Sequence, residues 1–222
     1  MDIIENYNHE KILHRNHIPA LIAVLNKEEL KEAFPAQAFI PLHWHRSVEI
    51  TLIENGECIL QVGNNRMVIK DDFTCVNSGV LHSIVGKHIQ DDVHVIIVVL
   101  SYDFIRMYCP DIENIIFDLT LKENHSDLKE LYYRLENLYL NQDQYTYLKI
   151  NACLLEILHL LLSQYQRPKF QNYKKNFEQT KEILSYIHEH YREDLTLEST
   201  AKYFHMSKEH FSRQFHHCVG KT

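Results

Sequence analysis

Between residues 20 and 100 the hydrophobic positions fall into short runs that are rich in β-branched and aromatic residues. Turn-forming clusters separate the runs, among them Glu54-Asn55-Gly56 and Asn77-Ser78-Gly79. This pattern predicts β-strands at residues 20–25, 48–53, 58–62, 66–69, 73–76 and 94–100. Many short strands with regular turns are typical of a sandwich or a jelly-roll barrel, whose interior can hold one small ligand.

After residue 100 the hydrophobic period changes from two to between three and four. Leu128, Leu131, Leu135 and Leu138 share one helical face, and a second amphipathic helix is expected over residues 145–164. The two helices predict a hairpin. Its wide apolar stripe either covers the barrel or forms a self-pairing dimer surface, and the two uses are compatible.

The C-terminal part begins after a polar, basic stretch with Pro168, which predicts a linker over residues 166–176. Thr196 is a natural N-cap for a short helix that ends near Phe204, and Ser207 is a natural N-cap for the next. Only His205 and Met206 lie between the two helices. Two short helices with so tight a turn predict a helix-turn-helix unit.

The second helix of this unit is expected to divide into a buried and an outward face. Phe211, Phe215 and Cys218 share one face and should form its core. The residues expected to point away are Lys208, His210, Ser212, Arg213 and His216. In a helix-turn-helix that face enters the major groove of double-stranded DNA, where Arg213 could read a guanine and Lys208 could bind a phosphate. The alternative is a solvated face that contacts nothing.

Composition limits the classes of protein that fit. The 222 residues suffice for one large or two small domains, and no apolar run approaches the length of a membrane span. We therefore expect a cytoplasmic protein without a signal peptide or a membrane partner, whose five scattered cysteines stay reduced. Residues 167–222 carry ten Lys/Arg and seven Asp/Glu, whereas the rest of the chain has a net charge of −10. This asymmetry predicts two domains with different partners.

The candidate chemistry lies in the motif H-x-H-x3-E formed by His43, His45 and Glu49. Their even spacing would place all three side chains on one face of a strand. His82 is expected to join them through the turn at Asn77-Ser78-Gly79. Three imidazoles and one carboxylate could form a site for a divalent metal, although no cofactor is certain, or the polar lining of an effector pocket.

Two stretches resemble a known family of regulators. Tyr191, Leu195-Thr196-Leu197, Ala201, Met206-Ser207, Phe211-Ser212-Arg213-Gln214-Phe215 and Gly220 resemble the first half of the DNA-binding domain of AraC/XylS-type transcription regulators. Residues 38–100 resemble the cupin-type sensor domain that is often fused to it, with departures at Asn77, where proline is usual, and at Asp71, where glycine is usual. The resemblance implies a small effector such as a sugar or related metabolite, and a homodimer formed through the helices after the barrel.

The resemblance also implies a second helix-turn-helix, which is missing here, so we expect weakened DNA binding. The predicted fold is α+β and multidomain: a cupin-like jelly-roll barrel (about 20–100) with helices (101–165) in a sensor and dimerisation domain (1–165), the linker, and an all-α helix-turn-helix subdomain (177–222). The predicted function is a DNA-binding transcription regulator that senses an effector and is not an enzyme. The alternatives are a metal-dependent cupin enzyme using His43, His45, Glu49 and His82, or a dimerising fragment without DNA binding.

Overall fold

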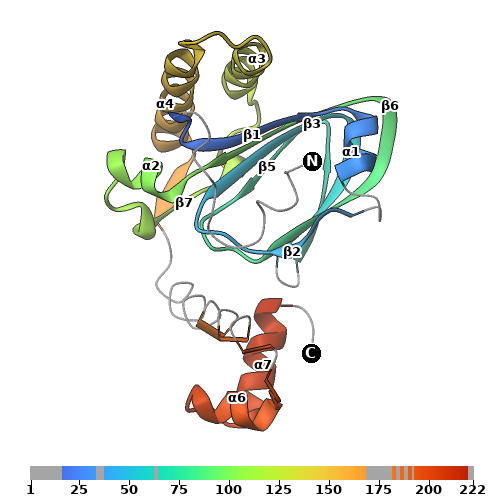
Figure 1. Cartoon of the computed structure of the whole chain (residues 1–222), viewed down its shortest axis with the longest axis vertical. Coiled ribbons are helices and arrows are strands. Elements are labelled where there is room, and N and C mark those ends of the chain that lie inside the picture. The colour runs from blue at the N-terminus through green and yellow to red at the C-terminus, as the bar shows by residue number, and fades with distance from the viewer. Residues whose placement is uncertain are drawn as a thin grey trace.

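The fold is α+β, as the sequence predicts, with one antiparallel sheet, helices beside it and a separate helical unit (Figure 1). The computed structural model describes residues 17–33, 38–62 and 65–168, together with 182–219 apart from 184, 185, 188, 189 and 192. The sheet contains β1 (Ala20–Leu25), β2 (Ala38–His43), β3 (Val48–Val62), β4 (Asn65–Lys70), β5 (Phe73–Val76) and β6 (His82–Leu100). The short helix α1 (Lys27–Ala33) follows β1, and α2 (Tyr102–Tyr108) follows β6.

The two long strands β3 and β6 organise the sheet because they pair with each other over most of their length. The first part of β3 also pairs with β5, and its last part with β4. Likewise β6 begins beside β2 and ends beside β1. The sheet is therefore folded over on itself (Figure 1). The pairing of the described strands runs from β1 to β4 without returning, so they form a folded sheet and not the closed barrel that the sequence suggests.

The expected turn at residues 54–56 is instead a bulge inside β3. Asn55 has a positive φ of 52°, and the register against β6 shifts between Glu54 and Gly56. Gly56 fits closely here, because a Cβ atom would lie 3.0 Å from Cγ2 of Val93, which would have to shift. A bulge and a turn use the same residues, so the local pattern predicts two strands where one bent strand exists.

The alternation of side chains divides the core into two layers. Val48, Ile50 and Leu52 of β3 point toward the helices, and Ile53 points into the fold of the sheet. On β6, Ile96, Val98 and Leu100 face the helices, and Val95, Ile97 and Val99 face the interior. Glu49 and Thr51 alternate with the helix-facing residues of β3 and are also buried, so they belong to the interior side.

The predicted helical hairpin is present as α3 (Ser126–Leu140) and α4 (Thr146–Gln164) and covers one side of the sheet (Figure 1). Leu128 and Leu135 of α3 and Leu154 and Leu161 of α4 are fully buried. Among the described helices, α4 alone has the length and apolar composition of a membrane span. The apolar face of α4 packs against β3 and β6, so the core of the protein accounts for its apolar composition.

The segment expected as a linker begins with a strand. Gln166–Pro168 form β8, which pairs with β7 (Ile115–Phe117). Two single-turn 3₁₀ helices, Ile112–Asn114 and Leu119–Leu121, flank β7. The antiparallel β7–β8 ladder ties residues 166–168 to the part of the chain that contains the sheet. The remainder of the expected linker, 169–176, lies outside the described residues.

The helical unit consists of α6 (Leu197–Tyr203) and α7 (Lys208–Val219). Thr196 caps α6 as predicted and forms a capping box with Ser199, while Ser207 Oγ accepts a hydrogen bond from the His210 amide (3.1 Å). His205 adopts a φ of 54° and reverses the chain between the helices. Ile183, Ala201 and Phe211 form the buried core, and Phe215 packs against it; the side chain of Cys218 lies outside the described residues.

Candidate functional site

The four predicted pocket residues come from three strands and one loop. His43 ends β2, His45 lies in the loop that follows, Glu49 is on β3 and His82 begins β6. The expectation of a single strand for His43, His45 and Glu49 is wrong, because residues 44–47 form a loop between β2 and β3. The residues still converge. His43 is the register partner of His82 at the start of β6, whereas Glu49 pairs with Val99 near the end of β6, so the folding of the sheet on itself brings Glu49 to the histidines.

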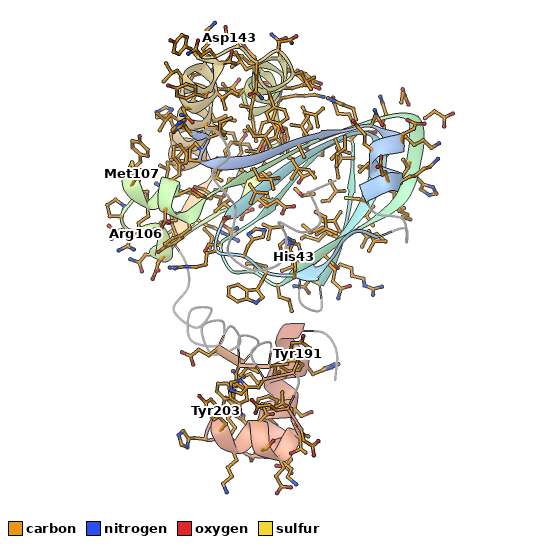
Figure 2. All side chains as sticks on the ribbon, viewed as in Figure 1. His43, Arg106, Met107, Asp143, Tyr191 and Tyr203 are labelled. Atoms are coloured by element: carbon orange, nitrogen blue, oxygen red, sulfur yellow. The ribbon has the colours of Figure 1, made fainter. Side chains whose placement is uncertain are left out.

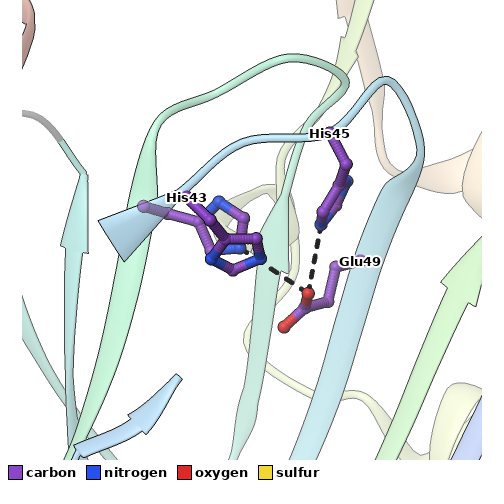
Figure 3. Close-up of side chains that lie close together, drawn as sticks. His43, His45 and Glu49 are labelled. Carbon is purple, nitrogen blue, oxygen red and sulfur yellow. Dashed lines mark hydrogen bonds and ion pairs between the residues drawn. The ribbon is translucent and has the colours of Figure 1, made fainter. Parts of the chain in front are cut away.

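The four side chains form one compact group (Figure 3). Each offers one ligand atom, and these atoms all lie within 4.8 Å of one another. Nε2 of His45 is 3.3 Å from Oε2 of Glu49, and Nε2 of His82 is 3.6 Å from the same oxygen. Glu49 and His82 are fully buried, whereas His43 is partly exposed. The group therefore lies at the edge of the interior with one histidine toward solvent.

The backbone orients two of the imidazole rings. Nδ1 of His45 lies 3.0 Å from the carbonyl oxygen of Ser47, and Nδ1 of His82 lies 2.9 Å from that of Val80. A carbonyl oxygen only accepts, so both Nδ1 atoms carry a proton and donate. The Nε2 atom of each ring faces the Glu49 carboxylate. Such an arrangement is favourable only when a proton or a cation lies between the nitrogen and the oxygen.

This donor set fits a divalent metal. The buried Nε2 atom of His82 has the Glu49 carboxylate as its neighbour, as expected of two ligands placed around one cation. A backbone carbonyl on the opposite ring nitrogen is the usual outer support of a metal-binding histidine. Imidazole and carboxylate ligands together suit zinc, iron, nickel or manganese.

The environment keeps Glu49 ionised. Burial by itself raises the pKa of this carboxyl group, but the hydrogen bonds and charges of His45 and His82 outweigh burial and hold the pKa well below its usual range. Thr51 lies two residues along the same strand, and its hydroxyl donates to Oε1 of Glu49 (3.4 Å). One carboxylate oxygen is thus directed toward the histidines and the other toward Thr51.

A mostly apolar cavity lies beside this group. It is narrow, with about 20 Å³ accessible to the centre of a water-sized sphere, which is room for about one or two water molecules. Thr51 lines the cavity and also bonds Glu49, so the cavity and the histidine–glutamate group are neighbours. The lining is largely aliphatic and includes Leu30, Ile40, Ile53, Ile84, Val95 and Ile97. Burial raises the pKa of Cys58, another lining residue, to about 12, so its thiol stays protonated.

The predicted DNA-binding residues lie on α7. Lys208, His210, Arg213 and His216 are exposed, and Ser212 is half-buried. Arg213 Nη2 lies 3.4 Å from Nδ1 of His210. Lys208 forms an ion pair with Glu198 of α6 (2.9 Å), a partner that the sequence pattern does not indicate. The exposed acid Glu209 also lies on α7.

Sequence reasoning missed the groups that hold the pocket in place. The carbonyls of Ser47 and Val80 orient rings through backbone atoms, which no residue pattern reports. The Thr51 contact could be found from its i+2 spacing to Glu49. Asn77 is visible in the sequence only as a departure from the cupin pattern, yet its side chain forms two hydrogen bonds to Phe117.

Comparison with known proteins identifies a regulator as a relative. No protein-family model matches the chain. The chain is 25% identical over 196 residues to an uncharacterized HTH-type transcriptional regulator, YdeC, of Bacillus subtilis (strain 168). The match covers 83% of this chain and 67% of the relative, so the chain spans about two thirds of that protein. The relationship to helix-turn-helix transcription regulators that the motif predicts is thereby confirmed.

Two solved structures resemble the chain at low similarity. One is the AraC-like transcriptional activator CuxR, with 16% identity, a TM-score of 0.41, and 89% and 67% of the two chains covered. The other is apo ToxT from Vibrio cholerae, with 12% identity, a TM-score of 0.39, and 94% and 96% covered. Likenesses at these TM-scores support no conclusion about the chemistry of this chain.

Proposed function

We propose that this chain is a DNA-binding transcription regulator of the AraC/XylS type, whose sheet domain senses a small effector or a metal ion. The observation that carries the proposal is the pair α6–α7, two capped short helices joined by a tight turn, with a small apolar core and a polar outer face. A pair of this kind places its second helix in the major groove of DNA. The sequence relationship to an HTH-type regulator supports the same function.

Within α7, Arg213 is the principal candidate for base recognition. It is exposed, and its guanidinium can donate two hydrogen bonds to a guanine edge. Lys208 is paired with Glu198 and would exchange that carboxylate for a phosphate, so its net contribution should be smaller. His210, Ser212 and His216 would contact the backbone or neighbouring bases.

The sensing site comprises the histidine–glutamate group and the adjacent cavity. A divalent metal would be held by His43, His45, His82 and the Glu49 carboxylate, and it would neutralise that carboxylate and join β2, β3 and β6. The cavity is lined mainly by aliphatic side chains, so we propose an effector with an apolar body and at most a few polar groups toward Thr51. A sugar, which the family resemblance suggests, would find few hydrogen-bond partners along that lining.

The turn between α3 and α4 is a candidate surface for a homodimer. Leu140, Tyr145 and Leu148 are each more than half exposed there, around Asp143 (Figure 2). The buried faces of the two helices cover the sheet, whereas the exposed apolar side chains at the tip are available for self-association. We place the regulator in the cytoplasm, where its DNA lies and where the four described free cysteines stay reduced.

The second candidate function is a metal-dependent enzyme. The four ligand atoms within 4.8 Å favour it, because a bound metal could act as a Lewis acid on a substrate in the cavity. A helix-turn-helix has no role in such catalysis. We therefore infer that the histidine–glutamate group serves sensing and that the chain is not an enzyme.

Selection from random DNA tests the function. The full chain would be incubated with a pool of random-sequence duplexes, and bound DNA would be amplified and sequenced. We expect an enriched motif. On the selected duplex Arg213→Ala should weaken binding about tenfold or more. Arg134→Ala, which removes an exposed arginine of α3, is the matched control and should leave the affinity unchanged. No enriched motif, or equal affinities of Arg213→Ala and the parent, would contradict DNA recognition through α7.

A further inference from the structure

The side chain of Asn77, in the turn after β5, connects that turn to β7. Its side-chain amide donates a hydrogen bond to the carbonyl oxygen of Phe117 (2.7 Å), and its side-chain oxygen accepts one from the Phe117 amide (2.7 Å). The carboxamide thus pairs with the backbone of β7 in the same way as a neighbouring strand would. Two hydrogen bonds fix both the position and the rotation of β7 relative to the turn that carries Asn77.

The same turn is tied to the pocket. The Gly79 amide donates to the carbonyl oxygen of His45 (2.6 Å), and the Val80 carbonyl accepts from Nδ1 of His82 (2.9 Å). The Val80 amide closes the turn on the Asn77 carbonyl (3.1 Å). His45 and His82 are therefore both bonded to the turn whose backbone holds the Asn77 side chain.

On the other side, β7 leads to the end of the sensor domain. It pairs with β8 in an antiparallel register, with Ile115 opposite Pro168 and Phe117 opposite Gln166. Next to this ladder the Asp118 amide donates to the carbonyl of Tyr165 at the end of α4 (2.8 Å). Arg167 also forms an ion pair with Asp118 (2.9 Å). In the chain, β8 is the last described element before the helix-turn-helix unit.

We propose that Asn77 transmits the state of the His43–His45–Glu49–His82 pocket to the β7–β8 ladder, and so to the segment that leads to the DNA-binding unit. Coupling between distant sites is carried by such chains of hydrogen bonds when they have two arrangements. The proposal deepens the proposed function and rests on the pocket being the sensing site. Asn77 acts as a positioning residue, because it contacts the strand and not the ligand.

Hydrogen exchange followed by mass spectrometry tests this role without knowledge of the effector. The pocket would be perturbed in two ways, by adding Zn²⁺ and by Glu49→Gln, and exchange would be read at the amides of residues 115–117, 166 and 167. In the parent chain each perturbation should change the exchange rate about 2- to 30-fold. In Asn77→Ala the same perturbations should leave it unchanged. Asn77→Asp, which can accept from the Phe117 amide but cannot donate, should retain part of the response.

Asn141→Ala is the matched control, because it also removes a carboxamide that donates to a backbone carbonyl, that of Asn137 (3.0 Å). It should respond as the parent does. Circular dichroism and thermal melting would establish that each variant is folded, and Asn77→Asp serves if Asn77→Ala does not fold. An equal response with and without the Asn77 carboxamide, or no response to Glu49→Gln in the parent, would overturn the proposal. If Zn²⁺ does not bind the parent, the metal site is wrong, and the Glu49→Gln comparison still decides the role of Asn77.

Discussion

The hydroxyl of Tyr132 on α3 donates a hydrogen bond to the carbonyl oxygen of Ile50 on β3 (2.9 Å). Tyr132 is fully buried, and burial raises the pKa of its hydroxyl well above the usual value, so the group remains a donor. Ile50 is the neighbour of Glu49 in the chain. This contact therefore fixes the helical hairpin to the strand that supplies the carboxylate of the pocket.

Replacing Tyr132 by Phe should lower the free energy of unfolding by about 1–3 kcal/mol, because a buried carbonyl loses its donor. The adjacent Tyr133→Phe is the comparison, since it removes a hydrogen bond to Glu54 from a side chain that is 41% exposed. Chemical denaturation of both variants measures the difference. An equal decrease in the free energy of unfolding for both variants would show that burial does not make the Tyr132 hydrogen bond more stabilising.

A second contact between the sheet and α3 should make stability depend on pH. His94 on β6 lies between Glu54 on β3 (3.2 Å) and Glu136 on α3 (2.7 Å), and Lys129 and Tyr133 of α3 also bond Glu54. Burial alone would lower the pKa of His94, but the hydrogen bonds and charges of the two carboxylates raise it. For Glu54 burial would raise the pKa, but bonds from Lys129, Tyr133 and His94 lower it.

The sign follows from these directions. Because the folded pKa of His94 is raised, its stabilising contribution is fully present below its unfolded pKa of about 6.5 and is lost as pH rises through the higher folded value. His94→Gln should therefore destabilise the chain more at pH 6 than at pH 9. Denaturation at both pH values tests this, with His159→Gln on the exposed side of α4 as the control. A larger effect at pH 9 would contradict the assigned direction.

Metal binding by the pocket is measurable without an activity assay. Elemental analysis of the tag-free chain after loading with Zn²⁺, Ni²⁺ or Mn²⁺ and dialysis should find metal, and His82→Ala should lose most of it because one imidazole ligand and its fixed ring are removed. His88→Ala, an exposed histidine on the same strand, should retain it. Equal metal content in the parent and His82→Ala would exclude the four-residue site and leave an organic effector as the ligand.

The sequence correctly predicts those helices whose positions are decided by nearby residues. The caps Thr196 and Ser207 mark the starts of α6 and α7 because a side-chain oxygen must satisfy the first amides of each helix. The hairpin α3–α4 follows from the three- and four-residue spacing of its leucines. The four pocket residues were named because imidazole and carboxylate groups at close spacing are uncommon without a shared task.

The remaining features depend on contacts between distant segments. β2 was missed because Pro41 interrupts its short run, and a proline weakens the prediction of a strand. The first half of β6 was missed because Gly86 and the polar stretch Gln90-Asp91-Asp92 resemble a loop, although pairing with β3 keeps it extended. The Asn77–Phe117 pair spans 40 residues and involves a backbone, so no periodicity could indicate it.

The exposed tip of the helical hairpin gives the prediction for self-association. Leu148 is 56% exposed at the start of α4, so Leu148→Glu places a charge on the surface without disturbing the core. If this tip forms the dimer interface, the dimer must bury the new charge without a partner. The dissociation constant should then rise on the order of tenfold or more, because an unpaired buried charge is costly. Glu130→Gln on α3 is the control, and analytical ultracentrifugation over a range of concentrations is the measurement. A dimer that survives Leu148→Glu unchanged would place the interface elsewhere, and a parent chain that is monomeric throughout would remove the homodimer from the proposed function.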